Sequence, residues 1–171
     1  MISYLDQPER GDLSVDSHRL WEKIKAGEYE VVISDVAVTE IARCDEQKRN
    51  TLFGYLGQIN FATVEVTKDD TALKIASRFI DFGILKQSSY NDCQHIAAAI
   101  TSGCDVIVSW NFAHIVNLKT MSGVKAITAL EGYADVLICT PSVILGGDEE
   151  RYIACQSQTL IQISPLQISI K

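Results

Sequence analysis

The 171-residue sequence lacks a long apolar run and has little positive charge. A membrane-spanning helix needs about 20 consecutive apolar residues, and the sequence contains neither such a run nor a basic, apolar leader segment at its start. The net charge is −7, from 15 Lys and Arg against 22 Asp and Glu. Nonspecific affinity for nucleic acids comes mainly from basic side chains, so the composition argues against a general phosphate-binding surface. We expect a cytoplasmic protein without membrane attachment.

The sequence also lacks cysteine motifs typical of metal sites and glycine-rich motifs typical of nucleotide binding. The five cysteines are an odd number, and they form neither a CxxC pair nor a Cys/His pattern typical of zinc ligands. We therefore expect buried free thiols at these positions, which are Cys44, Cys93, Cys104, Cys139 and Cys155. No GxGxxG or P-loop sequence follows a predicted strand, which makes a nucleotide-binding α/β protein the least favoured class of function.

Apolar runs and helical periodicities alternate along the chain. Predicted strands cover residues 30–34, 61–66, 105–110, 124–128 and 136–139. Predicted helices cover residues 13–24, 36–41, 52–59, 70–80 and 89–100, and glycines follow several of their ends. We expect Ser34 or Asp35 to cap the second helix, and Thr67 with Asp70 to form a capping box. This alternation predicts a single α/β domain with a mainly parallel sheet flanked by helices in three layers.

Three polar residues follow strands or begin helices of this predicted sheet. Glu40 and Asn111 each come just after a predicted strand, and ligands of open parallel sheets bind beyond the carboxyl ends of the strands. Asp92 falls near the start of its helix, where the helix dipole favours a negative charge. We therefore predict a site that contains Glu40, Asp92 and Asn111, with the two carboxylates as ligands of Mg²⁺ or Mn²⁺. Asp105 lies at the opposite end of its strand and is excluded from the site.

Simpler roles exist for each of these residues and for their neighbours. Asp92 lies three residues after Ser89 and could be only the acid of a capping box. His95 could orient a carboxylate or touch a phosphate, but a satisfied histidine on a helix face is equally compatible with its position. Trp110 and Phe112 could stack a base, although core packing is favoured. His18 and His114 are expected at the surface.

Three segments together resemble PIN-domain proteins, over roughly residues 2–145. The segments are ISDVAVTEI (33–41), NDCQHIAAA (91–99) and VIVSWNF (106–112). The PIN family includes the toxin ribonucleases of bacterial toxin–antitoxin pairs, so the resemblance implies a parallel sheet whose acids hold one or two Mg²⁺ or Mn²⁺ ions. It also matches Glu40 to the family's glutamate and Asp92 to the aspartate carried on a helix.

The chain departs from the family pattern in two places. Family members open with a strand that runs into an aspartate, whereas here the corresponding strand and acid are absent, and Asp6 falls too late to replace them. Asn111 stands where the family often has another aspartate. Only two carboxylates remain, which predicts weak or absent nuclease activity because a pair of metal ions would be poorly neutralised.

The predicted domain covers residues 1–147, and residues 148–171 form an atypical C-terminal tail. Loss of a central strand would leave backbone groups and apolar surface exposed. The strand-like segment 159–164 could fill that position in its own chain or in a neighbour's, although Pro165 limits an unbroken central strand. There is a plainer explanation of the same pattern: the start codon is placed too late, and the C-terminal tail has no fixed structure.

These observations predict a PIN-like, metal-dependent endoribonuclease of the toxin type that is impaired by the missing first aspartate. The alternative is a PIN-like fold that has lost catalysis and acts as a binding partner in a toxin–antitoxin or other complex. The sequence leaves open the RNA target, a small antitoxin protein as partner, and a homodimer.

Overall fold

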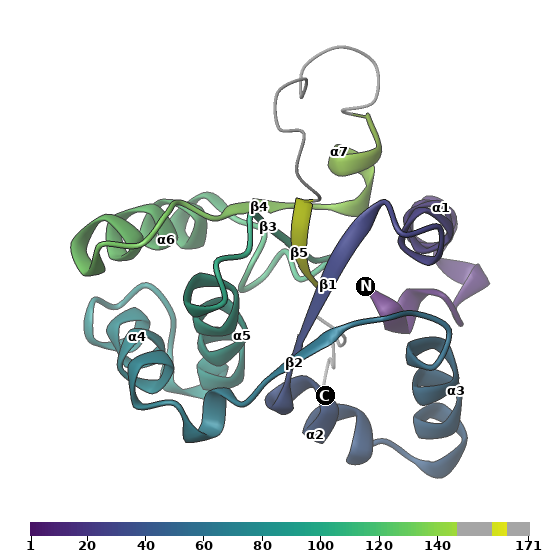
Figure 1. Cartoon of the computed structure of the whole chain (residues 1–171), viewed down its shortest axis with the longest axis horizontal. Helices are drawn as coiled ribbons and strands as arrows, with labels where there is room; N and C mark the ends of the chain where they lie inside the picture. Colours follow the sequence, from purple (N-terminus) through teal and green to yellow (C-terminus); the bar gives the residue numbers. More distant parts are fainter. Residues whose placement is uncertain (147–158, 164–171) are drawn as a thin grey trace.

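The computed structural model describes residues 1–146 and 159–163, which contain five parallel strands in one sheet (Figure 1). The strand order is β2-β1-β5-β3-β4. The strands are β1 (Tyr29–Ser34), β2 (Ala62–Val64), β3 (Val106–Val108), β4 (Leu137–Cys139) and β5 (Thr159–Ile163). The predicted α/β class with a parallel sheet is therefore confirmed.

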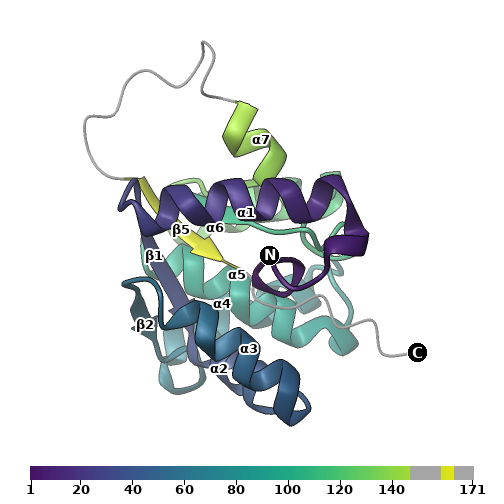
Figure 2. The same cartoon turned by 90° about the vertical axis from the view of Figure 1, so that its right-hand side faces the viewer.

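Helices cover the sheet on both sides. They are α1 (Asp12–Lys25), α2 (Asp35–Ala42), α3 (Glu46–Leu56), α4 (Asp70–Asp81), α5 (Tyr90–Thr101), α6 (Leu118–Glu131) and α7 (Pro141–Gly146), with short 3-10 helices η1 to η4 at Ile2–Tyr4, Pro8–Arg10, Val66–Lys68 and Gln87–Ser89. In Figure 1, α4, α5 and α6 lie on one side of the strands, and α1 and α3 lie on the other. Figure 2 shows α1 crossing its face of the sheet with α7 packed beside it. No helix in the described part of the chain is both long and apolar enough to cross a membrane.

The apolar side chains form two cores because successive residues of a strand point to opposite faces. On β1, Val31 and Ile33 join the core beneath α1 and α3, whereas Val32 joins the core that contains α4, α5 and α6. Val108 and Ile107 of β3 divide between the two cores in the same way. Burial of both faces explains why these strands read as continuous apolar runs in the sequence.

The carboxyl end of β1 leads directly into α2, and the sequence determines this corner. The Ser34 hydroxyl accepts a hydrogen bond from the Ala37 backbone N–H at 3.2 Å and so caps the helix. The carboxylate of Asp35 accepts backbone hydrogen bonds from Val36 at 2.9 Å and from Val66 at 3.0 Å. These bonds fix the start of α2 against the segment that follows β2, and they place Glu40 one turn later in the helix.

Strand β5 occupies the centre of the sheet. It pairs in parallel with β1 on one side and with β3 on the other, and Ile161 faces both Val31 and Val106 in register. The Ile161 side chain is fully buried. The segment 159–163 is therefore docked in its own chain, which is one of the arrangements that the sequence allows. Within the described residues no strand precedes β1, as predicted, while residues 148–158, 164 and Pro165 lie outside the described residues.

The predicted strand at residues 124–128 is wrong, because this segment belongs to helix α6. Val124 and Ile127 are three residues apart and both are buried on the core side of that helix. Asn117 caps the helix by accepting the Thr120 backbone N–H at 3.0 Å, and Gly132 ends it with a positive φ of 78°. The β-branched residues in the segment suggested a strand, but their spacing and the two caps favour a helix.

The predicted capping box of Thr67 and Asp70 is also wrong. Asp69 is the N-cap of α4, and its carboxylate accepts backbone hydrogen bonds from Thr71 and Ala72. The Thr67 hydroxyl instead donates to Asp35 across the gap between α2 and η3. A tertiary contact has therefore replaced the local one.

Candidate functional site

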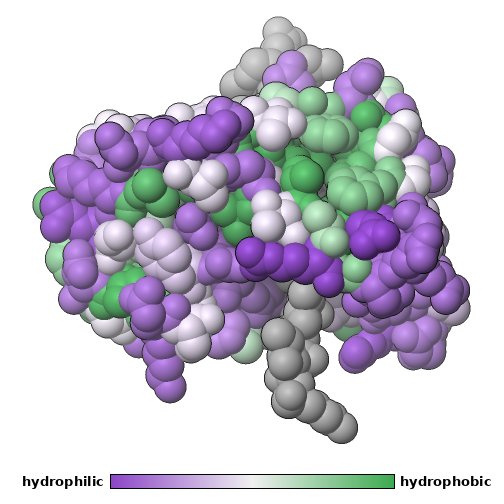
Figure 3. Space-filling view, turned by 90° about the horizontal axis from the view of Figure 1, so that it is seen from below, coloured by the Kyte–Doolittle hydropathy of each residue, from purple (hydrophilic) through white to green (hydrophobic). Residues whose placement is uncertain are grey.

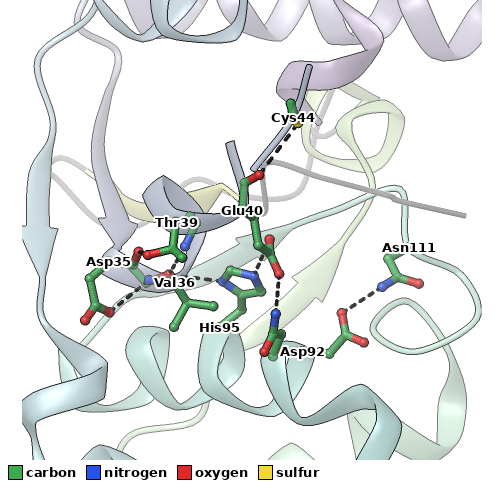
Figure 4. Close-up of polar contacts among 11 residues, drawn as sticks. Asp35, Val36, Thr39, Glu40, Cys44, Asp92, His95 and Asn111 are labelled. Carbon is green, nitrogen blue, oxygen red and sulfur yellow. Dashed lines mark hydrogen bonds and ion pairs between the residues drawn. The ribbon is translucent and has the colours of Figure 1, made fainter. Parts of the chain in front are cut away.

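The three residues predicted for the site come from different elements at one edge of the sheet (Figure 4). Glu40 lies on α2, which follows β1, and Asn111 lies in the loop that follows β3. Asp92 lies in the first turn of α5, which packs against both of these strands. All three therefore lie beyond the carboxyl ends of the strands, where ligands bind in parallel sheets.

The Glu40 carboxylate is held by two side chains from α5. Its Oε1 accepts a hydrogen bond from Asn91 Nδ2 at 2.9 Å, and its Oε2 lies 3.1 Å from His95 Nε2. The Glu40 side chain is 15 % exposed. Glu40 is thus a fixed and partly exposed acid.

His95 lies behind Glu40 and is almost fully buried, at 2 % exposure. Its second ring nitrogen, Nδ1, lies 3.1 Å from the Ser34 hydroxyl. Because that hydroxyl already accepts the Ala37 N–H, its own proton is available for Nδ1, and the Nε2–H of His95 can then donate to Glu40. One hydrogen-bonded chain therefore runs from the helix cap through the imidazole to the carboxylate.

These contacts also change the proton affinity of Glu40. Burial alone would raise the pKa of its carboxyl, but the hydrogen bonds from His95 and Asn91 and the positive charge of Arg43 outweigh that effect. The net result is a pKa below the ordinary value of 4.5. Glu40 is consequently an ionised acid at neutral pH.

Asp92 differs from Glu40 in its partner and in its pKa. Its Oδ1 accepts a single side-chain hydrogen bond, from Asn111 Nδ2 at 2.9 Å. Burial raises the pKa of Asp92 above the ordinary value of 3.8, and the negative charge of Glu40 raises it further, against the opposing effects of His95 and His114. The effect of Glu40 on the pKa of Asp92 indicates that its negative charge reaches the Asp92 carboxyl.

The Asn111 side chain orients Asp92 with its amide nitrogen. Its amide oxygen accepts the His114 backbone N–H at 3.1 Å, which leaves the nitrogen to face Asp92. Its backbone carbonyl also accepts hydrogen bonds from the Ile115 and Val116 backbone N–H groups. Asn111 therefore organises the loop after β3 and positions the acid.

The simpler reading of Asp92 as a capping residue does not describe this structure. Ser89 is the N-cap of α5, but its side chain makes no capping hydrogen bond. Asp105 precedes β3 at the opposite end from the site, as predicted. His18 and His114 are exposed, also as predicted.

The two aromatic residues of the β3 segment have different environments. Trp110 is 3 % exposed, which confirms its predicted core packing, whereas Phe112 is 50 % exposed and the prediction of core packing is wrong for it. The four described cysteines, Cys44, Cys93, Cys104 and Cys139, are free thiols, and the last three are buried. Burial raises the pKa of Cys93 and Cys104 to about 12.

Sequence reasoning missed two members of the site. Asn91 was recognised only as part of a motif, and Ser34 only as a helix cap, yet both take part in holding Glu40. Asn91 lies four residues before His95, so the two occupy the same face of α5. That spacing is the signal that could have indicated Asn91.

The capacity of the site for metal is limited. Within residues 1–146 and 159–163, no three His, Cys, Asp or Glu side chains gather closely enough to hold a metal ion. The charged oxygen donors at this edge are the carboxylates of Glu40 and Asp92, while the amide oxygen of Asn111 is neutral and already accepts the His114 N–H. Two carboxylates could hold at most one hydrated divalent ion, because a closely spaced pair of ions would need more negative charge.

Comparison of the chain with known proteins gives no match, either to a family model, to a curated protein or to a solved structure.

Proposed function

We propose that this chain is a PIN-like, metal-dependent endoribonuclease of low activity that hydrolyses RNA phosphodiesters. The observation that carries the proposal is the arrangement of Glu40, Asp92 and Asn111 at the carboxyl edge of a parallel sheet covered by helices on both faces. The presence of helices on both sides of the sheet supports the proposal of a three-layer, PIN-like fold. Strand β5 lies at the centre of this sheet, between β1 and β3.

Glu40 and Asp92 would hold the metal ion, with Asn111 fixing Asp92. A bound Mg²⁺ or Mn²⁺ lowers the pKa of a coordinated water and neutralises charge at the phosphate. The chain's own residues prepare this site in advance, since His95 and Asn91 keep Glu40 ionised and oriented. Such support of ligands by their neighbours is worth about ten- to a hundredfold in metal affinity.

The number of carboxylates supports a low rate. With Asn111 neutral, the site has only two negative charges. We therefore infer weak metal affinity and slow hydrolysis.

A second candidate function is a catalytically inactive PIN-like binding partner in a toxin–antitoxin or other protein complex. The observation in its favour is that the carboxylates of Glu40 and Asp92 already accept hydrogen bonds within the chain. In this second candidate the polar network stabilises the fold, and the site does not bind metal.

The decisive experiment combines metal binding with RNA cleavage. Calorimetry with Mn²⁺ and cleavage of a labelled single-stranded RNA in Mg²⁺ or Mn²⁺ should be measured for the wild type, Glu40→Gln and Asp92→Asn. We expect slow, metal-dependent cleavage that falls at least about a hundredfold in both variants. Glu22→Gln is the matched control, because Glu22 is an exposed acid of α1 that pairs only with Lys25 at 2.7 Å among the described ion pairs.

The outcomes separate the two candidates. Cleavage that requires metal and is unaffected by Glu40→Gln would overturn the proposed site. Absence of both Mn²⁺ binding and cleavage in the wild type would favour the inactive binding partner.

A further inference from the structure

Phe112 follows Asn111 directly and exposes half of its side chain, at 50 %. Exposure of a large aromatic ring to water is unfavourable, and Trp110, two residues earlier, is almost completely buried. Consecutive Cα atoms are about 3.8 Å apart, so Phe112 begins immediately beside the residue that positions Asp92. An exposed aromatic residue therefore follows directly, in the same loop, the residue whose amide binds Asp92.

The ring of Phe112 rests on a row of aromatic side chains. Its centroid lies 6.1 Å from that of Trp110, and the Trp110 ring lies 6.2 Å from that of Tyr4. Trp110 is itself fixed, because its indole N–H donates to the Ser17 hydroxyl of α1 at 2.9 Å. Contact with the fixed Trp110 ring therefore limits the movement of the Phe112 ring on one side.

The backbone around Phe112 is also held in place. Its N–H donates to the Trp110 carbonyl at 3.0 Å, and its own carbonyl accepts a hydrogen bond from Asn117 Nδ2 at 3.4 Å. Ile115, three residues later, is fully buried and anchors the loop to the core. An aromatic ring that is fixed before binding loses little conformational freedom when a ligand stacks on it.

We propose that Phe112 is a stacking platform for a nucleobase of single-stranded RNA, in a nucleotide next to the one whose phosphate lies at Glu40 and Asp92. The inference rests on the proposed function and adds a base-binding position to it. Stacking on an exposed aromatic ring accepts any base, because the phenyl ring of Phe112 has no hydrogen-bonding group that could distinguish one base from another. It also supplies affinity that a chain of net charge −7 cannot obtain from electrostatics alone.

The surroundings favour a nucleic-acid strand over an apolar protein partner. His114 and Ala113 follow Phe112 and are exposed, and the guanidinium of Arg10 lies 5.9 Å from the Tyr4 ring at the other end of the aromatic row. Asn111, directly before Phe112, binds the Asp92 carboxylate. Seen from below in the view of Figure 1, hydrophilic residues cover much of the surface, with the largest group of apolar residues at the upper right and smaller groups on the left (Figure 3).

The test compares two oligomers of equal length, a labelled oligouridine and an abasic strand, by fluorescence anisotropy in Ca²⁺ at low salt. The full chain is measured as wild type, Phe112→Ala and Phe112→Trp. Phe82→Ala is the matched control, because Phe82 is 52 % exposed at the end of α4 and has Arg78 over its ring at 5.8 Å. Thermal melting of each variant checks that it is folded.

We expect Phe112→Ala to weaken oligouridine binding about five- to 150-fold, the loss of one stacked base, and to leave abasic binding unchanged. Phe112→Trp should retain binding, and Phe82→Ala should behave as the wild type. Equal binding of both strands by the wild type, or an equal loss in Phe82→Ala, would overturn the inference and leave the proposed nuclease intact. Absence of binding to either strand would reject both.

Discussion

The two carboxylates of the site differ in how the chain holds them. Glu40 accepts hydrogen bonds from Asn91 and His95, and its pKa is lowered, whereas Asp92 accepts one from Asn111, and its pKa is raised. Both acids are partly buried at the same edge of the sheet. Burial acts on both carboxyls in the same direction, so the difference lies in the hydrogen-bond donors, which lower the pKa of Glu40 but do not outweigh burial at Asp92.

The two acids also belong to different halves of the sheet. Glu40 follows β1, which pairs with β2, while the Asn111 partner of Asp92 follows β3, which pairs with β4. The halves are joined by β5, which lies between β1 and β3, and by α5, which carries both Asp92 and His95. Integrity of the site therefore depends on these two elements.

The largest expected effect comes from breaking the junction between the halves at Ile161. Ile161→Asp places a charge at a fully buried position of β5, without a compensating partner among the described side chains. We expect a loss of about 3–5 kcal/mol in the free energy of unfolding, measured by urea denaturation.

Leu118→Asp is the control for this substitution. Leu118 is 82 % exposed in the first turn of α6, where an acid is favourable, so the free energy of unfolding should change by no more than about 0.5 kcal/mol. Equal stability of Ile161→Asp and the wild type would show that β5 does not join the halves in solution.

A smaller effect is expected from making the Asp92 half more acidic. Asn111→Asp replaces the amide 2.9 Å from Asp92 with a third carboxylate. We expect Mn²⁺ affinity to rise about tenfold, because the added charge attracts the cation, and stability without metal to fall through repulsion between the carboxylates. Calorimetry and thermal melting with and without Mn²⁺ measure the two effects.

Asn117→Asp provides a control with the same change in charge in the same loop. Asn117 caps α6 through its side-chain oxygen, and aspartate keeps this cap. The substitution also removes the 3.4 Å amide hydrogen bonds to the Phe112 and Ala113 carbonyls, so thermal melting must show that the variant is folded. An equal rise in Mn²⁺ affinity in this variant would mean that the general charge of the loop, and not contact with Asp92, attracts the metal.

The smallest expected effect is in the pH dependence of stability. The lowered pKa of Glu40 means that its ionised form stabilises the folded state above the ordinary value of 4.5, and this contribution is lost as the pH falls through the folded pKa. The raised pKa of Asp92 has the opposite sign. Its protonated form stabilises the folded state below 3.8, and that contribution is lost as the pH rises through the folded pKa.

The two acids can be separated by urea unfolding between about pH 3 and about pH 7. Relative to the wild type, Glu40→Gln should lose stability as the pH rises, and Asp92→Asn should gain it. Parallel curves for both variants would contradict the asymmetry between the acids.

Local signals in the sequence predicted much of the fold. The Ser34 cap, the strand before it and the helix 90–101 follow from neighbouring residues, and the structure confirms them. The errors arose where a distant contact competed with a local one. The Thr67 hydroxyl donates to the distant Asp35 and does not form the predicted capping box. The core contacts of Val124 stabilise a helix where β-branched residues suggested a strand.

The site was predictable in its location but not in its hydrogen bonding. Positions after parallel strands indicated Glu40 and Asn111, since the carboxyl edge follows from strand order. The direction of the Asn111 amide depends on the His114 backbone N–H, and the exposure of Phe112 depends on the packing of Trp110. Neither can be read from residue types alone, because both depend on the conformation of one loop.

The central placement of β5 has a consequence for synthesis on the ribosome. Translation proceeds from the N-terminus, so β1 and β3 emerge well before β5, and during that interval their inner edges have no strand between them. Unpaired strand edges in a nascent chain are prone to aggregation. We expect the two acids to come together only late in translation, so that the nascent protein depends on chaperones until its last strand arrives.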